Sequence, residues 1–139
     1  MLGNGRFARF GKVRYAAPPG TAVVSAMEKD RFKTLGEKLL AFADARDWRQ
    51  FHSPKNLSMA MAGEVGELLE HFQWLSESEA RELPTHKVEE VALELADIQI
   101  YLIRIAQELG VDLLGAVERK IDINEERYPA DRVRGSHRK

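Results

Sequence analysis

Apolar residues recur every three or four positions along most of the chain, which is the spacing of amphipathic helices. This pattern predicts four helices, over about 28–47, 56–75, 85–109 and 112–127. No segment shows the alternation of apolar and polar residues that is typical of a half-buried strand. The sequence therefore predicts an all-α fold with a four-helix bundle core. In the second helix the residues on one side are Leu57, Met61, Val65, Leu68, Phe72 and Leu75.

Residues with strong capping preferences stand at several of the predicted helix ends. Thr85 and Asp112 are expected to cap the third and fourth helices at their N-termini, and Gly110 is expected to end the third. Residues 48–54 form a connector, because the residue before Pro54 avoids helical backbone angles. The polar stretch 76–84 predicts a loop with at most a short helical turn.

The middle of the third helix, residues 91–106, is apolar on nearly every side. A helix of this kind is buried in a bundle or in an oligomer. A core of about 110 residues hardly covers such a helix by itself. We therefore expect a homo-oligomer, a homodimer or a homotetramer.

Composition narrows the class of protein. The chain has 139 residues, 44% of them hydrophobic, which suits one globular domain. A net charge of −1 argues against a dedicated nucleic-acid binder, and no apolar run is long enough for a membrane span, so neither partner is expected. The absence of cysteine excludes disulfides and thiol chemistry and fits a cytoplasmic location.

The two ends of the chain are expected to lie outside the folded domain. Residues 1–27 contain four basic residues and no acidic one, a composition found in organelle transit peptides. A flexible basic tail, with Met27 as the natural start, is the favoured interpretation. The helical domain is then expected over 28–130, with a flexible C-terminal tail over 131–139.

Four carboxylates are spaced so that they can converge. Glu64 and Glu67 lie three residues apart on the second helix, and Glu94 and Asp97 repeat that spacing on the third. Two antiparallel helices can turn these pairs toward each other, and four such charges repel unless a cation lies between them. Carboxylate oxygens suit Mg²⁺, with Mn²⁺ as the alternative, rather than zinc.

Other interpretations of these acids stay open. Acidic residues on helices are usually solvated, but a carboxylate on an apolar face costs several kcal/mol unless it is paired or metal-bound. A buried salt bridge to Arg104 or Lys120 is the structural alternative. Gly63 and Gly66 could allow a ligand or simply another helix to come close.

The sequence from Glu64 to Leu68, followed by Phe72-Gln73-Trp74, resembles the MazG-like all-α nucleoside triphosphate pyrophosphohydrolases. The family pattern is E-x-x-E, a spacer, then E-x-x-D, and the spacer here is 68–93. The resemblance covers about residues 30–130 and is strongest to the dCTP pyrophosphatase branch. It rests further on Asp47-Trp48, Phe51-His52, Pro54-Lys55-Asn56-Leu57, Ile100-Tyr101-Leu102, Asp122-Ile123-Asn124 and Arg127-Tyr128-Pro129.

This resemblance implies a house-cleaning hydrolase that converts dCTP or modified deoxynucleoside triphosphates to the monophosphate and pyrophosphate. It also implies a magnesium site made by the four carboxylates. Alternatives are an enzyme like the dimeric dUTPases or the phosphoribosyl-ATP pyrophosphohydrolases, or a non-enzymatic helical adaptor.

Individual residues can be given roles on this basis. Glu67, at the edge of the apolar arc, is our hypothesis for the general base, with Glu64 beside it. Aromatic faces could stack on the base, and cationic or amide side chains could hold the phosphates. The substrate-binding candidates are Trp48, His52, Trp74, Tyr101, Lys120, Asn124, Arg127 and Tyr128.

Overall fold

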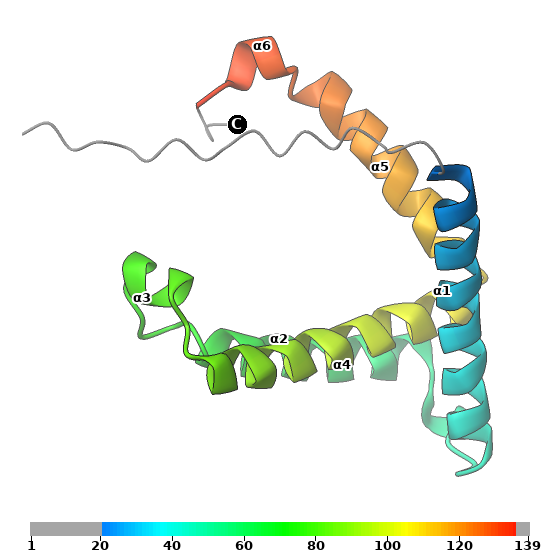
Figure 1. Ribbon diagram of the computed structural model, residues 1–139. Coiled ribbons are helices and arrows are strands. Elements are labelled where there is room, and N and C mark those ends of the chain that lie inside the picture. Colours follow the sequence, from blue (N-terminus) through cyan, green and yellow to red (C-terminus); the bar gives the residue numbers. More distant parts are fainter. Residues whose placement is uncertain (1–20, 136–139) are drawn as a thin grey trace, which may run out of the picture. The chain divides into compact units, whose positions relative to one another are not determined.

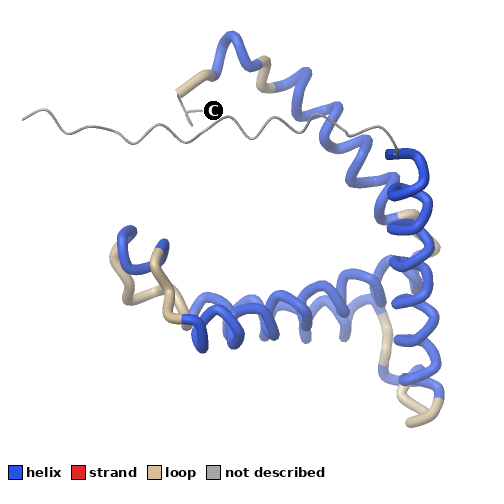
Figure 2. Tube along the Cα trace, viewed as in Figure 1, coloured by secondary structure: helices blue, strands red, loops and turns tan. Residues whose placement is uncertain are grey.

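The computed structural model describes residues 21–135, with side chains described from residue 31 onward. This part of the chain contains helices and no strand, which confirms the all-α prediction (Figures 1 and 2). The predicted basic tail lies largely outside the described residues, and α1 begins within it. The helices are α1 (Thr21–Asp44), η1 (Arg49–Phe51), α2 (Pro54–Glu70), α3 (Glu77–Arg81), α4 (Thr85–Leu109), α5 (Leu113–Arg127) and α6 (Ala130–Val133).

The chain divides into two compact units within α1, between Lys33 and Thr34. All site residues discussed below belong to the second unit. No helix within the described residues is both long and apolar enough to cross a membrane.

Helices α2 and α4 lie side by side and are joined through the short helix α3 (Figure 1). Leu57 on α2 and Val91, Ile103 and Ala106 on α4 are buried, and their burial against neighbouring helices stabilises the fold. The rest of α4 is less covered than its composition predicts, since Leu93 is 66% exposed in the single chain.

The start of α2 and the segment after it follow the local sequence. Ser53 precedes Pro54, the first residue of α2, and its hydroxyl accepts a hydrogen bond from the backbone N–H of Asn56 at 3.2 Å. Ser76 and Glu79 form a capping box on α3, the short helical turn foreseen in the 76–84 loop.

Three residues predicted to cap or end a helix can be compared with the structure. Asp112 caps α5 by accepting from the N–H of Gly115 at 3.1 Å, and Gly110, at φ 63°, ends α4. Both predictions are confirmed. The prediction for Thr85 is wrong: Pro84 is the N-cap of α4, and Thr85 is already helical with no side-chain capping bond. Proline has a fixed φ and needs no backbone donor, so it can precede a helix without side-chain help.

The end of α1 determines where Trp48 lies. The backbone N–H of Trp48 donates to the carbonyl of Ala43 at 2.9 Å, and that of Asp47 donates to Asp44 at 3.1 Å. Together these bonds make a Schellman motif with Asp47 in the left-handed position, at φ 54°. The motif ends α1 three residues earlier than predicted and brings the Trp48 ring edge-on to Phe42, with centroids 5.8 Å apart.

Candidate active site

Three of the four predicted carboxylates converge across α2 and α4. Glu64 projects from α2, and Glu94 and Asp97 project from neighbouring turns of α4. One oxygen of each carboxylate lies within 4.8 Å of the others. Glu64 and Glu94 are half-buried and Asp97 is exposed, so the cluster is open to solvent on one side.

Electrostatics around this cluster favour a positive ligand. The pKa of Glu64 is raised by burial first, and then by the negative charges of Glu67, Asp97 and Glu94. The pKa of Tyr101 is raised by burial and by the charges of Glu64 and Asp97. A cation among these oxygens would offset the repulsion, and an all-carboxylate donor set fits a hard divalent ion.

Glu67 lies beside this group rather than within it. It is exposed and lines a cavity of about 490 Å³ with Glu94 and Trp74. The structure therefore assembles three of the four predicted ligands at short range and places the fourth next to them.

His71 was not singled out from the sequence, yet it faces the carboxylates. Its Nδ1 lies 3.8 Å from an oxygen of Glu90, and its Nε2 lies 4.0 Å from an oxygen of Glu94. Lys87 donates to the same Glu90 oxygen at 2.6 Å. The sequence signal that could have identified His71 is its spacing, because it is four residues after Glu67 and so lies on the same helix face.

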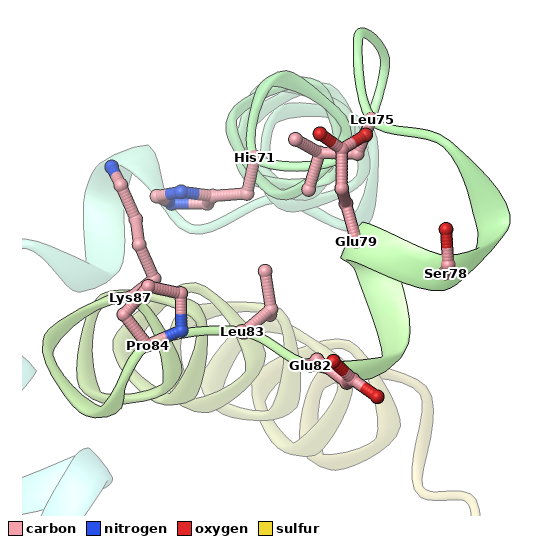
Figure 3. A pocket seen from close by; sticks show the side chains of 8 residues that line it. All are labelled: His71, Leu75, Ser78, Glu79, Glu82, Leu83, Pro84 and Lys87. Carbon is pink, nitrogen blue, oxygen red and sulfur yellow. The ribbon is translucent and has the colours of Figure 1, made fainter.

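His71 also borders a second cavity of about 410 Å³, between the end of α2, α3 and the start of α4. Figure 3 shows His71 and Lys87 on one side of this cavity and Ser78 and Glu82 on the other. It is lined by both acidic and basic groups and contains none of the predicted site residues.

A third cavity, of about 370 Å³, brings three predicted base-binding residues together. Trp48, His52 and Tyr101 line it, and the ring centroids of Trp48 and His52 lie 6.4 Å apart. Asp97 lines the same cavity and so connects it to the carboxylate cluster. We call this space the aromatic cavity. Its other lining residues are Leu39, Phe42, Leu57, Ile100 and Arg104.

Arg104 is the buried charged residue of the described chain, with 2% of its surface exposed. Its ion pair is with Glu108, at 2.5 Å, rather than with the carboxylates of the cluster. The salt-bridge alternative considered for those acids therefore does not involve this arginine. The pKa of His52 is lowered, mainly by burial and then by the charge of Arg104, an effect that Glu108 partly opposes.

The remaining substrate-binding candidates lie elsewhere in the structure. Trp74 is 85% exposed and lines the cavity of Glu67. Lys120, Asn124 and Arg127 are exposed on α5, and Tyr128 follows that helix, with the Arg127 guanidinium 5.6 Å from its ring centre. The three cavities described above are lined without these four residues.

The all-α fold, with acidic residues from two adjacent helices beside an aromatic cavity, corresponds to a known class. The model of the MazG-like family matches residues 60–139, and the chain belongs to this family.

Particular relatives support the predicted branch. The chain is 50% identical to human dCTP pyrophosphatase 1 over 100 residues, covering 70% of this chain and 59% of that protein. It is also 50% identical to the dCTP pyrophosphatase 1 of Rattus norvegicus over 97 residues, covering 68% of this chain and 57% of the relative. The chain thus spans somewhat more than half the length of these relatives.

A solved structure shares the fold. The chain resembles a pyrophosphatase from Archaeoglobus fulgidus with a TM-score of 0.68 and 39% sequence identity. The match covers 71% of this chain and 93% of the other. The predicted membership of the MazG-like family, near the dCTP pyrophosphatase branch, is confirmed.

Proposed function

We propose that this protein is a nucleoside triphosphate pyrophosphohydrolase that releases the monophosphate and pyrophosphate. The observation that supports this most directly is that Glu64, Glu94 and Asp97 converge next to a cavity lined by Trp48 and Tyr101. A carboxylate cluster suits the metal that accompanies a triphosphate, and an adjoining aromatic space suits a flat base. The similarity to dCTP pyrophosphatases supports dCTP, or a modified deoxynucleoside triphosphate, as the substrate.

Magnesium is the proposed metal, with manganese as the alternative. The three converging carboxylates would hold it, with Glu67 as a further ligand. Bound there, the metal would neutralise phosphate charge and lower the pKa of a nearby water. The raised pKa of Glu64 supports this assignment, because repulsion among the acids is what a cation would relieve.

The side chains of the chain have distinct proposed tasks. Glu67 is exposed at an open cavity, where its carboxylate can accept a proton from the attacking water while Glu64 helps to orient that water. Trp48, His52 and Tyr101 line the space proposed for the base. Phosphate binding by the α5 residues and base stacking by Trp74 remain predictions; the α5 residues are Lys120, Asn124, Arg127 and Tyr128.

Self-association is part of the proposal. Exposed apolar residues follow one another every seven positions along α4, a spacing that keeps a single stripe in register along one side of a helix. We propose that a second copy of this chain covers the stripe, in a dimer or tetramer. A cytoplasmic location, which the cysteine-free sequence suggests, stays a prediction. The stripe consists of Val88, Leu95, Leu102 and Leu109.

Sedimentation of Leu95→Gln tests this stripe. The substitution places a polar group in the middle of the stripe and should shift the protein toward the monomer at micromolar concentration. Val117→Gln, at an exposed position of α5, is the control and should sediment like the wild type. A monomeric wild-type protein would contradict the proposal.

The activity is tested by a screen of canonical and modified triphosphates, with the products identified. We expect magnesium-dependent release of monophosphate and pyrophosphate, with dCTP or a modified relative cleaved fastest. Preference for dUTP or phosphoribosyl-ATP would point to the alternative enzymes. No hydrolysis, together with no magnesium binding by calorimetry, would favour an adaptor.

A further inference from the structure

Arg104, which lines the aromatic cavity, carries a buried donor that has no partner. Its side chain is more than nine-tenths buried, and its Nε atom has no hydrogen-bond partner. A buried polar group left unsatisfied costs about 1–3 kcal/mol. An unsatisfied donor on an arginine beside Leu39, Leu57 and Ile100, three of the lining residues, therefore calls for a ligand or a structural explanation.

The rest of the guanidinium is already held in place. One terminal nitrogen donates to Gln107 at 2.6 Å, and the other donates to Glu108 at 2.5 Å and lies 3.5 Å from His52 Nδ1. Arginine carries five N–H bonds in a rigid fork, and both terminal nitrogens have a partner, whereas the Nε atom has none. The guanidinium is thus fixed in position while one of its donors lacks an acceptor.

A close helix contact supports this arrangement. Gly36 on α1 is buried, and a Cβ at this position would lie 2.8 Å from the amide nitrogen of Gln107. The glycine makes room for the amide whose oxygen accepts from Arg104. Substitution of Gly36 would therefore disturb the anchor of the guanidinium.

The charge balance indicates what kind of acceptor fits. Glu108 already supplies a counter-charge to Arg104, and the neighbouring walls of the cavity are largely apolar. A second anion would have to be desolvated there, and the attraction to an arginine that is already paired would do little to offset that cost. A neutral acceptor, such as the carbonyl oxygen of a heterocycle, needs only the hydrogen bond.

His52 can supply a second donor to the same cavity. Arg104 can only donate, so its contact with Nδ1 requires a neutral ring that carries its proton on Nε2. The lowered pKa of His52 agrees with a neutral ring. The ring also lines the cavity, edge-on to Trp48.

We propose that Arg104 is a specificity-determining residue that donates from its buried guanidinium to a carbonyl oxygen of the base in the aromatic cavity. This inference rests on the proposed function for the identity of the ligand. It predicts selection of pyrimidines, which all carry a ring carbonyl, over adenine, which has none. Glu108, Gln107 and Gly36 are positioning residues for the guanidinium.

The test compares a ligand that has a base with one that lacks it. Calorimetry with magnesium measures the binding of a nonhydrolysable dCTP analogue and of inorganic triphosphate to the wild type, Arg104→Met and Arg104→Lys. Methionine keeps much of the side-chain length but removes every N–H. Arg104→Met should bind the analogue on the order of 10- to 100-fold more weakly than the wild type does. Its affinity for inorganic triphosphate should be unchanged. Arg104→Lys keeps a charge and donors, so its affinity for the analogue should lie between those of the wild type and Arg104→Met.

Two controls separate recognition from structural support. Glu125→Gln, at an exposed position of α5, should leave both affinities unchanged. Circular dichroism and thermal melting of each variant show whether the fold is intact. If Arg104→Met does not fold, the Arg104→Lys comparison decides in its place.

Equal affinities of the wild type and Arg104→Met for the analogue would overturn the proposal. An equal loss for both ligands would also overturn it, because it would assign Arg104 a structural role alone. Failure of the proposed function has a different signature: the wild type would bind the analogue and yet leave dCTP intact. A wild type that binds neither ligand would overturn both.

Discussion

Asp97→Asn removes one negative charge from the carboxylate cluster while keeping the size of the side chain. The oxygens of Glu64, Glu94 and Asp97 lie within 4.8 Å of one another. Two unit charges at that distance repel by about 0.9 kcal/mol in water and by about 3.5 kcal/mol at the effective dielectric of a protein surface. Because Asp97 is exposed, the lower value is the better guide.

The substitution relieves two of the three repulsions, so the metal-free protein should gain about 2 kcal/mol of unfolding free energy. For a domain of this size that gain raises Tm by roughly 8 °C. The assay is thermal unfolding followed by circular dichroism, in chelator and again with magnesium. Magnesium should stabilise the wild type clearly and Asp97→Asn much less, because the variant has lost a ligand.

Glu89→Gln is the matched control, because it removes a charge from an exposed position on the same helix. Its Tm should stay close to that of the wild type in both buffers. The reasoning fails if Asp97→Asn is no more stable than the wild type in chelator. It also fails if magnesium stabilises both proteins equally.

Three further predictions follow from the structure. The pKa of Glu64 is raised above 4.5 on folding, so the unfolded chain loses this proton first as the pH rises. The free energy of unfolding of the metal-free protein should therefore fall as pH rises from about 4.5 through the folded pKa. Urea titrations at a series of pH values would detect this trend, and a flat profile would contradict it. Glu67→Gln should lower turnover by at least about 100-fold while sparing much of the nucleotide binding, and near-normal turnover would exclude Glu67 as the base. Gly110→Ala should lower the free energy of unfolding by about 1–2 kcal/mol in denaturant titrations, because Gly110 has a left-handed φ of 63° that alanine adopts at a cost. Gly63→Ala, at a helical site with open space around it, should not lower the free energy of unfolding.

Much of the fold was predictable from local sequence. The periodicity of apolar residues located the long helices, and the capping preferences of Asp112 and the C-terminal preference of Gly110 located two of their ends. The end of α1 was missed because Asp47 occupies a left-handed position that usually belongs to glycine. The capping prediction for Thr85 failed because Pro84, one position earlier, already occupies the N-cap and Thr85 is the first residue of the helix.

The site was predictable only where spacing carried the information. The E-x-x-E and E-x-x-D spacings pointed to four residues, of which Glu64, Glu94 and Asp97 converge and Glu67 lies beside them, since positions three apart share a helix face. The location of Arg104 at the aromatic cavity depends on how α1, α2 and the connector between them pack against α4, which spacing along one helix does not encode. The same holds for His71, whose contacts to Glu90 and Glu94 cross from one helix to the other.

The Schellman motif at Asp47 has a consequence for attempts to make this protein more heat-resistant. Glycine at this position would remove a left-handed backbone penalty of about 1 kcal/mol and is the substitution that a stabilisation campaign would select. Yet the carbonyl and the side chain of Asp47 each accept from the Gln50 amide at 2.9 Å. Glycine would keep the carbonyl bond and lose the side-chain bond, which helps to hold the turn between Trp48 and His52. A gain in melting temperature would therefore come with a looser wall for the aromatic cavity, so thermal tolerance and selectivity oppose each other at this single position.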